Sequence, residues 1–244
     1  DCGKTSASRQ TYVTGKAAYN AGLKFRAEIL RLSNMGNDSL ITIEKNEIII
    51  SNQGKRQKID LSAFQLIENN YVIVAEETYD PPTTSLDENG QGIPYAIYGY
   101  GAQMAEITVD TELGLLKIDK ITAAHDLGKT INPLLAEGQI EGGIAQGIGF
   151  ALMEEYIPSK TENLHDYLIP SIGYVPEIES ILIEKNDPEG PFGARGLGEH
   201  VLIPTAPAIM NALRNATGAI ITKLPALPDR ILQAIEISKN GSNK

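Results

Sequence analysis

The residues from 133 to about 155 constrain the fold most, because they predict a long helix that is unusually rich in glycine. Pro133 stands in the first turn, where proline is favoured, and Asn132 before it is a good capping residue. One face of this helix would carry almost no side chains, since small residues recur on it: Gly138, Gly142, Ala145 and Gly149. Each glycine costs a helix about 1 kcal/mol relative to alanine. The bare face therefore serves either tight packing against another backbone or the close approach of a ligand.

A second glycine-rich segment, residues 190–198, ends at the carboxylate of Glu199, and an apolar stretch that predicts a helix over 201–216 follows it. An acid at this place can simply satisfy the free N–H groups at a helix start. It can also act as a general base held by a rigid loop in a partly dry pocket. The glycine order is Gly-x-x-Gly-x-Gly rather than that of dinucleotide-binding loops, and no Gly-Lys-Ser/Thr occurs, so NAD and ATP sites are excluded.

Near the N-terminus, residues 6–14 are small and polar and precede an apolar stripe at helical spacing between Ala18 and Leu32. Thr14 is expected to cap this helix, and Gly36 with Asn37 to end it. A polar loop that leads into a helix N-terminus is suited to bind an anion. The same pattern is also typical of a Ser/Thr turn that only caps its own helix.

The remaining patterns predict an α+β protein with mixed, antiparallel-rich sheets and packed helices. Alternation predicts a long antiparallel pair at 95–110 and 115–124. The other expected strands are 40–43, 47–50, 57–61, 71–79 and 177–184, with a hairpin turn at Lys45 and Asn46. We further expect a short helix at 63–68 that Ser62 caps, a final helix at 229–237, and a loop over 80–92.

Composition is ordinary for a globular protein of one large or two small domains, since 42% of the 244 residues are hydrophobic and 21% are charged. The net charge of −10, without a Lys/Arg cluster, argues against nucleic acid or anionic membranes as partners. No apolar run reaches the ~18 residues of a membrane span, so we expect a cytoplasmic protein. With Cys2 as the single cysteine and three widely spaced histidines, no metal site made of protein ligands is expected. A metal would need a cofactor that brings its own ligands.

Three segments together resemble, in the same order, motifs of the molybdenum hydroxylases, the xanthine dehydrogenase and aldehyde oxidase family. They are residues 6–15 (SASRQTYVTG), 126–149 (DLGKTINPLLAEGQIEGGIAQGIG) and 190–199 (GPFGARGLGE). The resemblance covers nearly the whole chain, and residues 163–170 sit where the family carries a similar segment. It implies that residues 1–244 are the C-terminal portion of a molybdopterin-binding domain, with sub-parts 1–94 and 95–244. The N-terminal portion would lie on another segment or chain.

The same resemblance implies roles for particular residues. Glu199 would be the general base. The residues expected at the cofactor are Ala7, Ser8, Arg9, Gln10, Gly142, Gly143, Gln146, Gly196, Leu197 and Gly198. The cofactor would be molybdopterin, as the pterin or its cytosine dinucleotide, with molybdenum that carries a sulfido or selenido ligand and no protein ligand. Iron–sulfur and flavin (FAD) groups would reside on other chains or segments.

The implied function is that of a molybdopterin-dependent oxidoreductase, inactive without its partners. It would hydroxylate an electrophilic carbon of an N-heterocycle, xanthine-like or nicotinate-like, with water as the oxygen source. An aldehyde oxidoreductase of the same family and a non-catalytic structural subunit of such a complex are the alternatives. A hydrolase based on Glu199 is disfavoured because the sequence offers no second placed acid or nucleophile. His200 follows the glutamate where some relatives carry proline.

Overall fold

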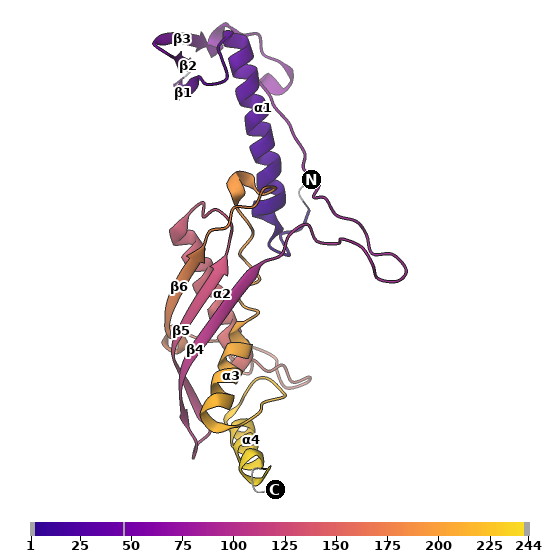
Figure 1. The fold of residues 1–244 in the computed structure, drawn as a ribbon, viewed down its shortest axis with the longest axis vertical. Helices are drawn as coiled ribbons and strands as arrows, with labels where there is room; N and C mark the ends of the chain where they lie inside the picture. The colour runs from indigo at the N-terminus through magenta and orange to yellow at the C-terminus, as the bar shows by residue number, and fades with distance from the viewer. Residues whose placement is uncertain (1–2, 46, 242–244) are drawn as a thin grey trace. The chain divides into compact units, whose positions relative to one another are not determined.

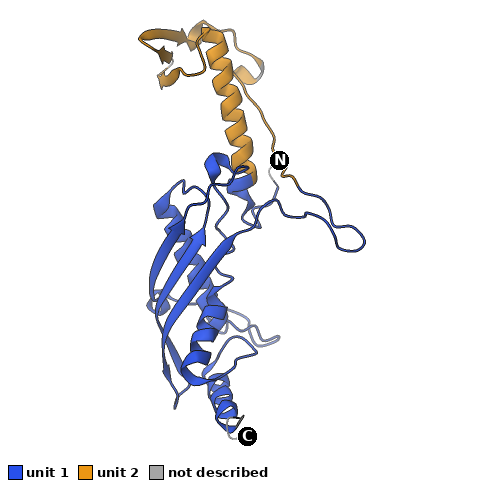
Figure 2. Ribbon diagram, viewed as in Figure 1, with its two compact units in different colours: residues 1, 3–12, 83–244 blue, residues 2, 13–82 orange. Residues whose placement is uncertain are grey.

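The structure is a computed structural model that describes residues 3–45 and 47–241 (Figure 1). These residues form two compact units: one contains residues 3–12 and 83–241, the other residues 13–82 (Figure 2). The sequence suggested a boundary at residue 94. In the structure, residues 3–12 and 83–94 belong instead to the same unit as the residues that follow 94. The first unit holds both the segment around Ser8 and the loop around Glu199.

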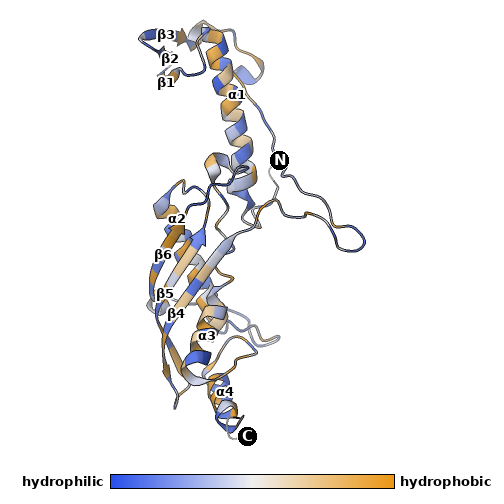
Figure 3. Cartoon of the chain, viewed as in Figure 1, coloured by the Kyte–Doolittle hydropathy of each residue, from blue (hydrophilic) through white to orange (hydrophobic). Residues whose placement is uncertain are grey.

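The first unit is built on a three-stranded sheet with helices on one face (Figure 1). Strand β4 (Tyr100–Asp110) pairs antiparallel with β5 (Leu115–Asp126), and β5 pairs parallel with β6 (Glu177–Ile183). Helices α2 (Pro133–Leu152) and α3 (Thr205–Thr217) cover the apolar face. Polar and apolar residues alternate along the strands (Figure 3), so alternate side chains point into this core. The expected antiparallel pair is confirmed, although β4 begins at Tyr100 rather than at residue 95.

Isoleucines dominate the core between the sheet and the helices. Ile121 on β5 meets Ile140, Ile144 and Ile148 of α2, and all four are at most 1% exposed. The three α2 residues recur every four positions, which keeps them on one face of the helix. As expected, Asn132 caps α2, because its Oδ1 accepts the Leu135 N–H at 3.1 Å. Burial of this isoleucine stripe therefore stabilises α2 despite its many glycines.

A smaller core lies where α4 (Pro228–Gly241) packs near the end of the sheet, and it includes Leu213, Ala219, Ala226, Ile231 and Ile235. The helix expected from residue 201 begins only at Thr205. A residue that precedes proline is biased away from helical geometry, so Ile203 before Pro204 does not extend the helix. Residues 201–204 instead form turns. No helix of the described ranges combines the length and apolarity that crossing a membrane requires.

The second unit packs helix α1 (Gly15–Ser33) against an antiparallel sheet of β1 (Leu40–Glu44), β2 (Glu47–Asn52) and β3 (Lys55–Asp60). Its core contains Ile29, Leu30, Ile48, Ile50 and Ile59. The three expected strands are therefore present. Of the expected hairpin turn, Asn46 lies outside the described residues.

Other local predictions in this unit are wrong. Thr14 makes no capping side-chain bond, because Gln10–Thr14 is π-helical and runs directly into α1. Asn34, in the left-handed region at φ 51°, ends α1 instead of Gly36. In place of a helix at 63–68 there is a short 3-10 turn, Leu61–Ala63, which Asp60 caps by accepting the Ser62 N–H at 2.9 Å. Residues 71–79 form no strand, since they pair with no other strand among the described residues.

Candidate functional site

Glu199 is joined to the segment around Ser8 at both its backbone and its side chain. The Glu199 N–H donates to Ser8 Oγ at 2.7 Å, and Glu199 Oε1 accepts the Ala7 N–H at 2.9 Å. The carboxylate itself is exposed in this chain. Two of the three segments that carried the family resemblance are therefore in direct contact, through residues 191 and 192 positions apart.

The segment around Ser8 has an unusual backbone. Ala7 and Ser8 lie consecutively in the left-handed region, at φ 56° and 52°. This region costs an L-residue roughly 1–2 kcal/mol, so the surrounding structure must impose it. Gly196 lies directly against this backbone, because a Cβ on Gly196 would fall on the Ser8 carbonyl oxygen. Ser8 Oγ accepts from Glu199, so its own O–H remains able to donate to a ligand.

The loop that ends in Glu199 is fastened to the end of β5 by an ion-pair cluster. Arg195 contacts Asp126 at 2.9 Å and Asp187 at 3.4 Å, and all three side chains are 9–11% exposed. Backbone bonds continue the attachment, with the Arg195 N–H donating to the Leu127 carbonyl at 2.8 Å. Buried guanidinium and carboxylate groups are costly unless paired. The cluster therefore fixes the course of the loop before it reaches Glu199.

Helix α2 uses its glycines in two different ways. A Cβ at Gly143 would lie 2.9 Å from the Val201 side chain, and one at Gly147 would overlap Thr205. These two glycines permit close packing of α2 against the segment that leads into α3. At Gly138 and Gly142, by contrast, an added Cβ would meet nothing within 4 Å. The bare surface that could admit a ligand is thus limited to the latter pair.

Two exposed glutamines flank this bare surface. Gln146 was expected, and it is exposed on α2. Gln139 was not expected, yet its Oε1 lies 3.7 Å from where a Cβ of Gly198 would be. Gln139, Gly142 and Gln146 are spaced i, i+3, i+7, so they share one helix face. That spacing was visible in the sequence and could have added Gln139 to the candidates.

The other expected site residues have local roles in this chain. Gln10 Nε2 donates to the Lys4 carbonyl and to Thr5 Oγ1, both at 3.3 Å, so it braces its own loop. The Arg9 N–H donates to the Ser6 carbonyl at 3.4 Å. Leu197 is buried in the core, so only its backbone can face a ligand. Gly198 has Ser8 Oγ 3.4 Å from its Cβ position and completes the contact between the two segments.

Next to Glu199 in the sequence, His200 forms a pair with the buried His125, and neither histidine was among the expected site residues. His125 on β5 is fully buried, and its ring centroid lies 5.1 Å from that of His200. Burial, and to a lesser extent the nearby His200, lower the pKa of His125 to about 4. The pKa of His200 is lowered by burial too, although Asp126 opposes the shift. Both rings are therefore neutral near pH 7. The position of His200 next to Glu199 was the available signal.

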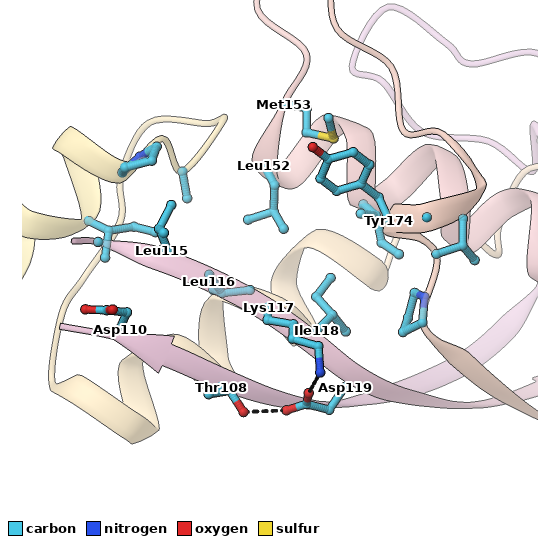
Figure 4. A pocket seen from close by; sticks show the side chains of 18 residues that line it. Thr108, Asp110, Leu115, Leu116, Lys117, Ile118, Asp119, Leu152, Met153 and Tyr174 are labelled. Atoms are coloured by element: carbon cyan, nitrogen blue, oxygen red, sulfur yellow. Dashed lines mark hydrogen bonds and ion pairs between the residues drawn. The ribbon is translucent and has the colours of Figure 1, made fainter. Parts of the chain in front are cut away.

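A cavity of about 690 Å³ in the same unit lies elsewhere, between the ends of β4, β5 and α2 and the start of α4 (Figure 4). Its lining is mostly apolar, and its Asp119 is already paired with Lys117 at 2.7 Å and Thr108 at 2.6 Å. None of the expected site residues lines it. In the part of the chain that the structure describes, no three His, Cys, Asp or Glu side chains are grouped so that they could hold a metal ion.

Comparison with known proteins gives consistent matches. Residues 1–176 match the family model of the molybdopterin cofactor-binding domain. The chain is 33% identical to the putative xanthine dehydrogenase molybdenum-binding subunit of Escherichia coli (strain K12), over 95% of this chain and 31% of that protein. Its fold matches aldehyde oxidoreductase from Desulfovibrio desulfuricans with a TM-score of 0.76 at 32% identity, over 95% of this chain and 23% of that one. Quinoline 2-oxidoreductase from Pseudomonas putida 86 matches with a TM-score of 0.73 at 26% identity, over 95% and 30%.

The chain spans less than a third of the length of each of these three relatives. The family model nevertheless covers well over half of the chain, and the Escherichia coli subunit matches 95% of the chain. The family that the three motifs indicated is thereby confirmed. The chain belongs to the molybdenum hydroxylases, the family of the xanthine dehydrogenases and aldehyde oxidoreductases, and it has the α+β fold of their molybdopterin-binding domains.

Proposed function

We propose that this chain is part of a molybdenum-dependent hydroxylase in which Glu199 is the general base. The observation that carries the proposal is the direct contact of Glu199 with Ala7 and Ser8, at 2.9 and 2.7 Å. It brings the segment that resembles the family's base loop against the segment that resembles its cofactor-binding loop. The substrate class that we propose is an N-heterocycle, hydroxylated at an electrophilic carbon with oxygen from water.

The chemistry of the surrounding groups fits a molybdopterin cofactor. Ser8 offers an O–H donor, and the exposed amides of Gln139 and Gln146 offer donors and acceptors to a pterin edge. Between the two amides, Gly142 leaves open space where a flat ring system could approach the helix. Donors and acceptors of this kind beside bare backbone suit the binding of a polar ring system. We therefore place the cofactor between α2 and the segment 7–8, beside Gly196 and Gly198.

When bound, a molybdopterin cofactor supplies the oxygen transfer and the two-electron redox chemistry. The task of Glu199 is to accept a proton from the oxygen nucleophile. One carboxylate oxygen, Oε1, is held by the Ala7 N–H, which orients Oε2 for that proton. Glu199 is exposed in this chain, so the rest of the protein would have to cover it to exclude water from the base.

The partners that we propose are those that the family resemblance implies. The other part of the molybdopterin-binding subunit would cover the site and complete the substrate pocket. Iron–sulfur and flavin groups on further chains or segments would carry the electrons away. We propose that the assembled enzyme is cytoplasmic and that this chain alone is inactive.

The general base is tested with Glu199→Gln in the assembled enzyme. The glutamine oxygen can still accept the Ala7 N–H, so the loop contact survives while the proton acceptor is lost. Turnover should fall more than ~10²-fold with molybdenum and pterin content unchanged. Glu236→Gln, on an exposed position of α4, is the matched control and should turn over normally. A Glu199→Gln enzyme of nearly normal rate refutes the role.

An aldehyde is the alternative substrate class, because one of the structural matches is an aldehyde oxidoreductase at 32% identity. Turnover of xanthine, nicotinate and quinoline compared with a series of aldehydes decides between the classes. Molybdenum and pterin analysis of the same purified enzyme also tests the third possibility, a non-catalytic subunit. Such a subunit would contain neither molybdenum nor pterin.

A further inference from the structure

Gln103 on β4 connects the buried histidines to the segment that follows Glu199. Its Nε2 donates to the Val201 carbonyl at 2.8 Å, and its Oε1 accepts from Thr205 Oγ1 at 2.8 Å. The same Nε2 lies 3.2 Å from His125 Nε2. One side chain thus joins β4, β5, the turn at Val201 and the first residue of α3.

These partners allow the Gln103 amide only one orientation. If the amide were flipped, Oε1 would face the Val201 carbonyl oxygen, and two acceptors would then oppose each other. The NH₂ group therefore points to Val201, and its second hydrogen points to His125 Nε2. That nitrogen must be unprotonated to accept it. A proton on His125 Nε2 would set two donors against each other and so disfavour the amide orientation in which Gln103 donates to Val201.

The described groups around His125 do not strongly favour its charged form. His200 faces its ring from the loop side at 5.1 Å. Asp126, next to it on β5, is paired with Arg195 at 2.9 Å, and Leu182, its partner in register on β6, is uncharged. The ring packs against bare backbone, because a Cβ at Gly101 would overlap it. Burial, with the nearby His200, keeps the pKa of His125 near 4, so the neutral ring prevails at neutral pH. Of its two tautomers, the one protonated at Nδ1 accepts from Gln103 at Nε2.

We propose that Gln103 is a positioning residue for Glu199: with neutral His125 it fixes the Val201 carbonyl, two residues after the base, and thereby the direction of the Glu199 carboxylate. The inference rests on the proposed role of Glu199. It adds that the segment of the base has two supports: Ser8, which accepts the Glu199 N–H, and Gln103, which donates to the Val201 carbonyl. A misplacement of about 1 Å can cost an enzyme ~10²-fold in rate, so such support has a measurable value.

The test uses Gln103→Glu in the assembled enzyme, with Gln233→Glu on the exposed face of α4 as the matched control. A carboxylate cannot donate to Val201, and it favours protonated His125. We expect kcat to fall ~10- to 100-fold with little change in KM or in molybdenum and pterin content. We also expect the acid limb of the kcat profile to move to higher pH. Amide hydrogen exchange in residues 199–203 of the cofactor-free protein should accelerate, a readout independent of turnover.

Thr205 provides a second route should Gln103→Glu fail to assemble. Thr205→Ser keeps the hydroxyl that orients Gln103 and should retain near-normal kcat, whereas Thr205→Val should repeat the loss. The positioning role is overturned if Gln103→Glu, or Thr205→Val in its place, behaves like the control. In that case kcat and the hydrogen-exchange rates would stay within about twofold of the control, and the acid limb of the kcat profile would not move. The result of Glu199→Gln then still stands by itself, so failure of the two proposals is distinguishable.

Discussion

The hydroxyl oxygen of Ser8 accepts the backbone N–H of Glu199 at 2.7 Å, across 191 positions of sequence. Neither segment fixes its own conformation. Ser8 lies in the left-handed region, and Glu199 follows a loop of glycines. Each is held by the other, since the Glu199 carboxylate returns a bond to the N–H of Ala7. A substitution in either segment should therefore alter the conformation of both.

Ser8→Ala should destabilise the contact, because the Glu199 N–H loses its acceptor, at a cost of about 1 kcal/mol. Ser8→Gly removes the same hydroxyl but tolerates the positive φ, so it should be more stable than Ser8→Ala by roughly 1 kcal/mol. Thermal unfolding of the two variants measures the difference. Equal stability of the pair would show that the left-handed backbone is not strained.

This contact also marks the limit of what the sequence could predict about the site. The motifs identified both segments, and their family resemblance implied that both lie at the cofactor. The particular bonds could not be foreseen, because they depend on how the Arg195 cluster directs the loop over α2. For the same reason, helical spacing alone places Gln139 and Gln146 on one face but cannot tell that Gln139 lies beside Gly198.

For the fold, the sequence was most informative where a long periodic segment lies close in the chain to the residues that pair with it or cap it. The pair β4 and β5 and the capped helix α2 are examples. The alternation at residues 71–79 was misleading, because a strand needs a neighbour to pair with, and the sequence does not reveal whether one is present. The glycine spacing on α2 left packing and ligand approach as alternatives. The structure assigns Gly143 and Gly147 to packing and leaves Gly142 open.

Substitution of the two kinds of glycine should have opposite effects. Gly147→Ala would force a methyl group into Thr205, and such overpacking costs typically about 1–3 kcal/mol. Gly138→Ala meets nothing within 4 Å and should gain up to about 1 kcal/mol of helix stability. Gly142→Ala should also be stable without cofactor, yet it should lower the pterin content of the assembled enzyme. Unfolding curves and pterin analysis check these outcomes; a loss of stability in Gly138→Ala contradicts the assignment.

Removal of the Arg195 side chain should strongly destabilise the loop before Glu199. In Arg195→Met, Asp126 and Asp187 would remain buried without a cation, and breaking such a pair costs about 3–5 kcal/mol. Arg195→Lys should recover only part of this, because one ammonium cannot reproduce the guanidinium's contacts with both carboxylates. Chemical denaturation measures the loss. The exposed pair of Lys117 with Asp119 is the control, and Lys117→Met should change stability by less than about 1 kcal/mol.

Because His125 is buried, we expect the folded state to lose stability as the pH falls from 6.5 to about 4. Its pKa is lowered from the ordinary 6.5 to about 4 by burial, so within this range the unfolded chain binds a proton that the folded chain does not. Stability therefore rises with pH across the window, is complete above about 6.5, and receives no further contribution from this group below about 4. The full effect is on the order of 3 kcal/mol. His200, whose pKa is lowered as well, acts in the same direction.

Unfolding curves of His125→Phe and of the unchanged protein, recorded from pH 7.5 to 4, isolate this contribution. The phenylalanine ring occupies the same space and cannot titrate, so the slope of stability against pH should flatten in the variant even if its stability at pH 7.5 differs. His165→Gln, at an exposed position, should keep the original slope. If His125→Phe and the unchanged protein show the same slope, His125 is not the group that links protonation to unfolding, and the dependence of Gln103 on its neutral form loses its basis.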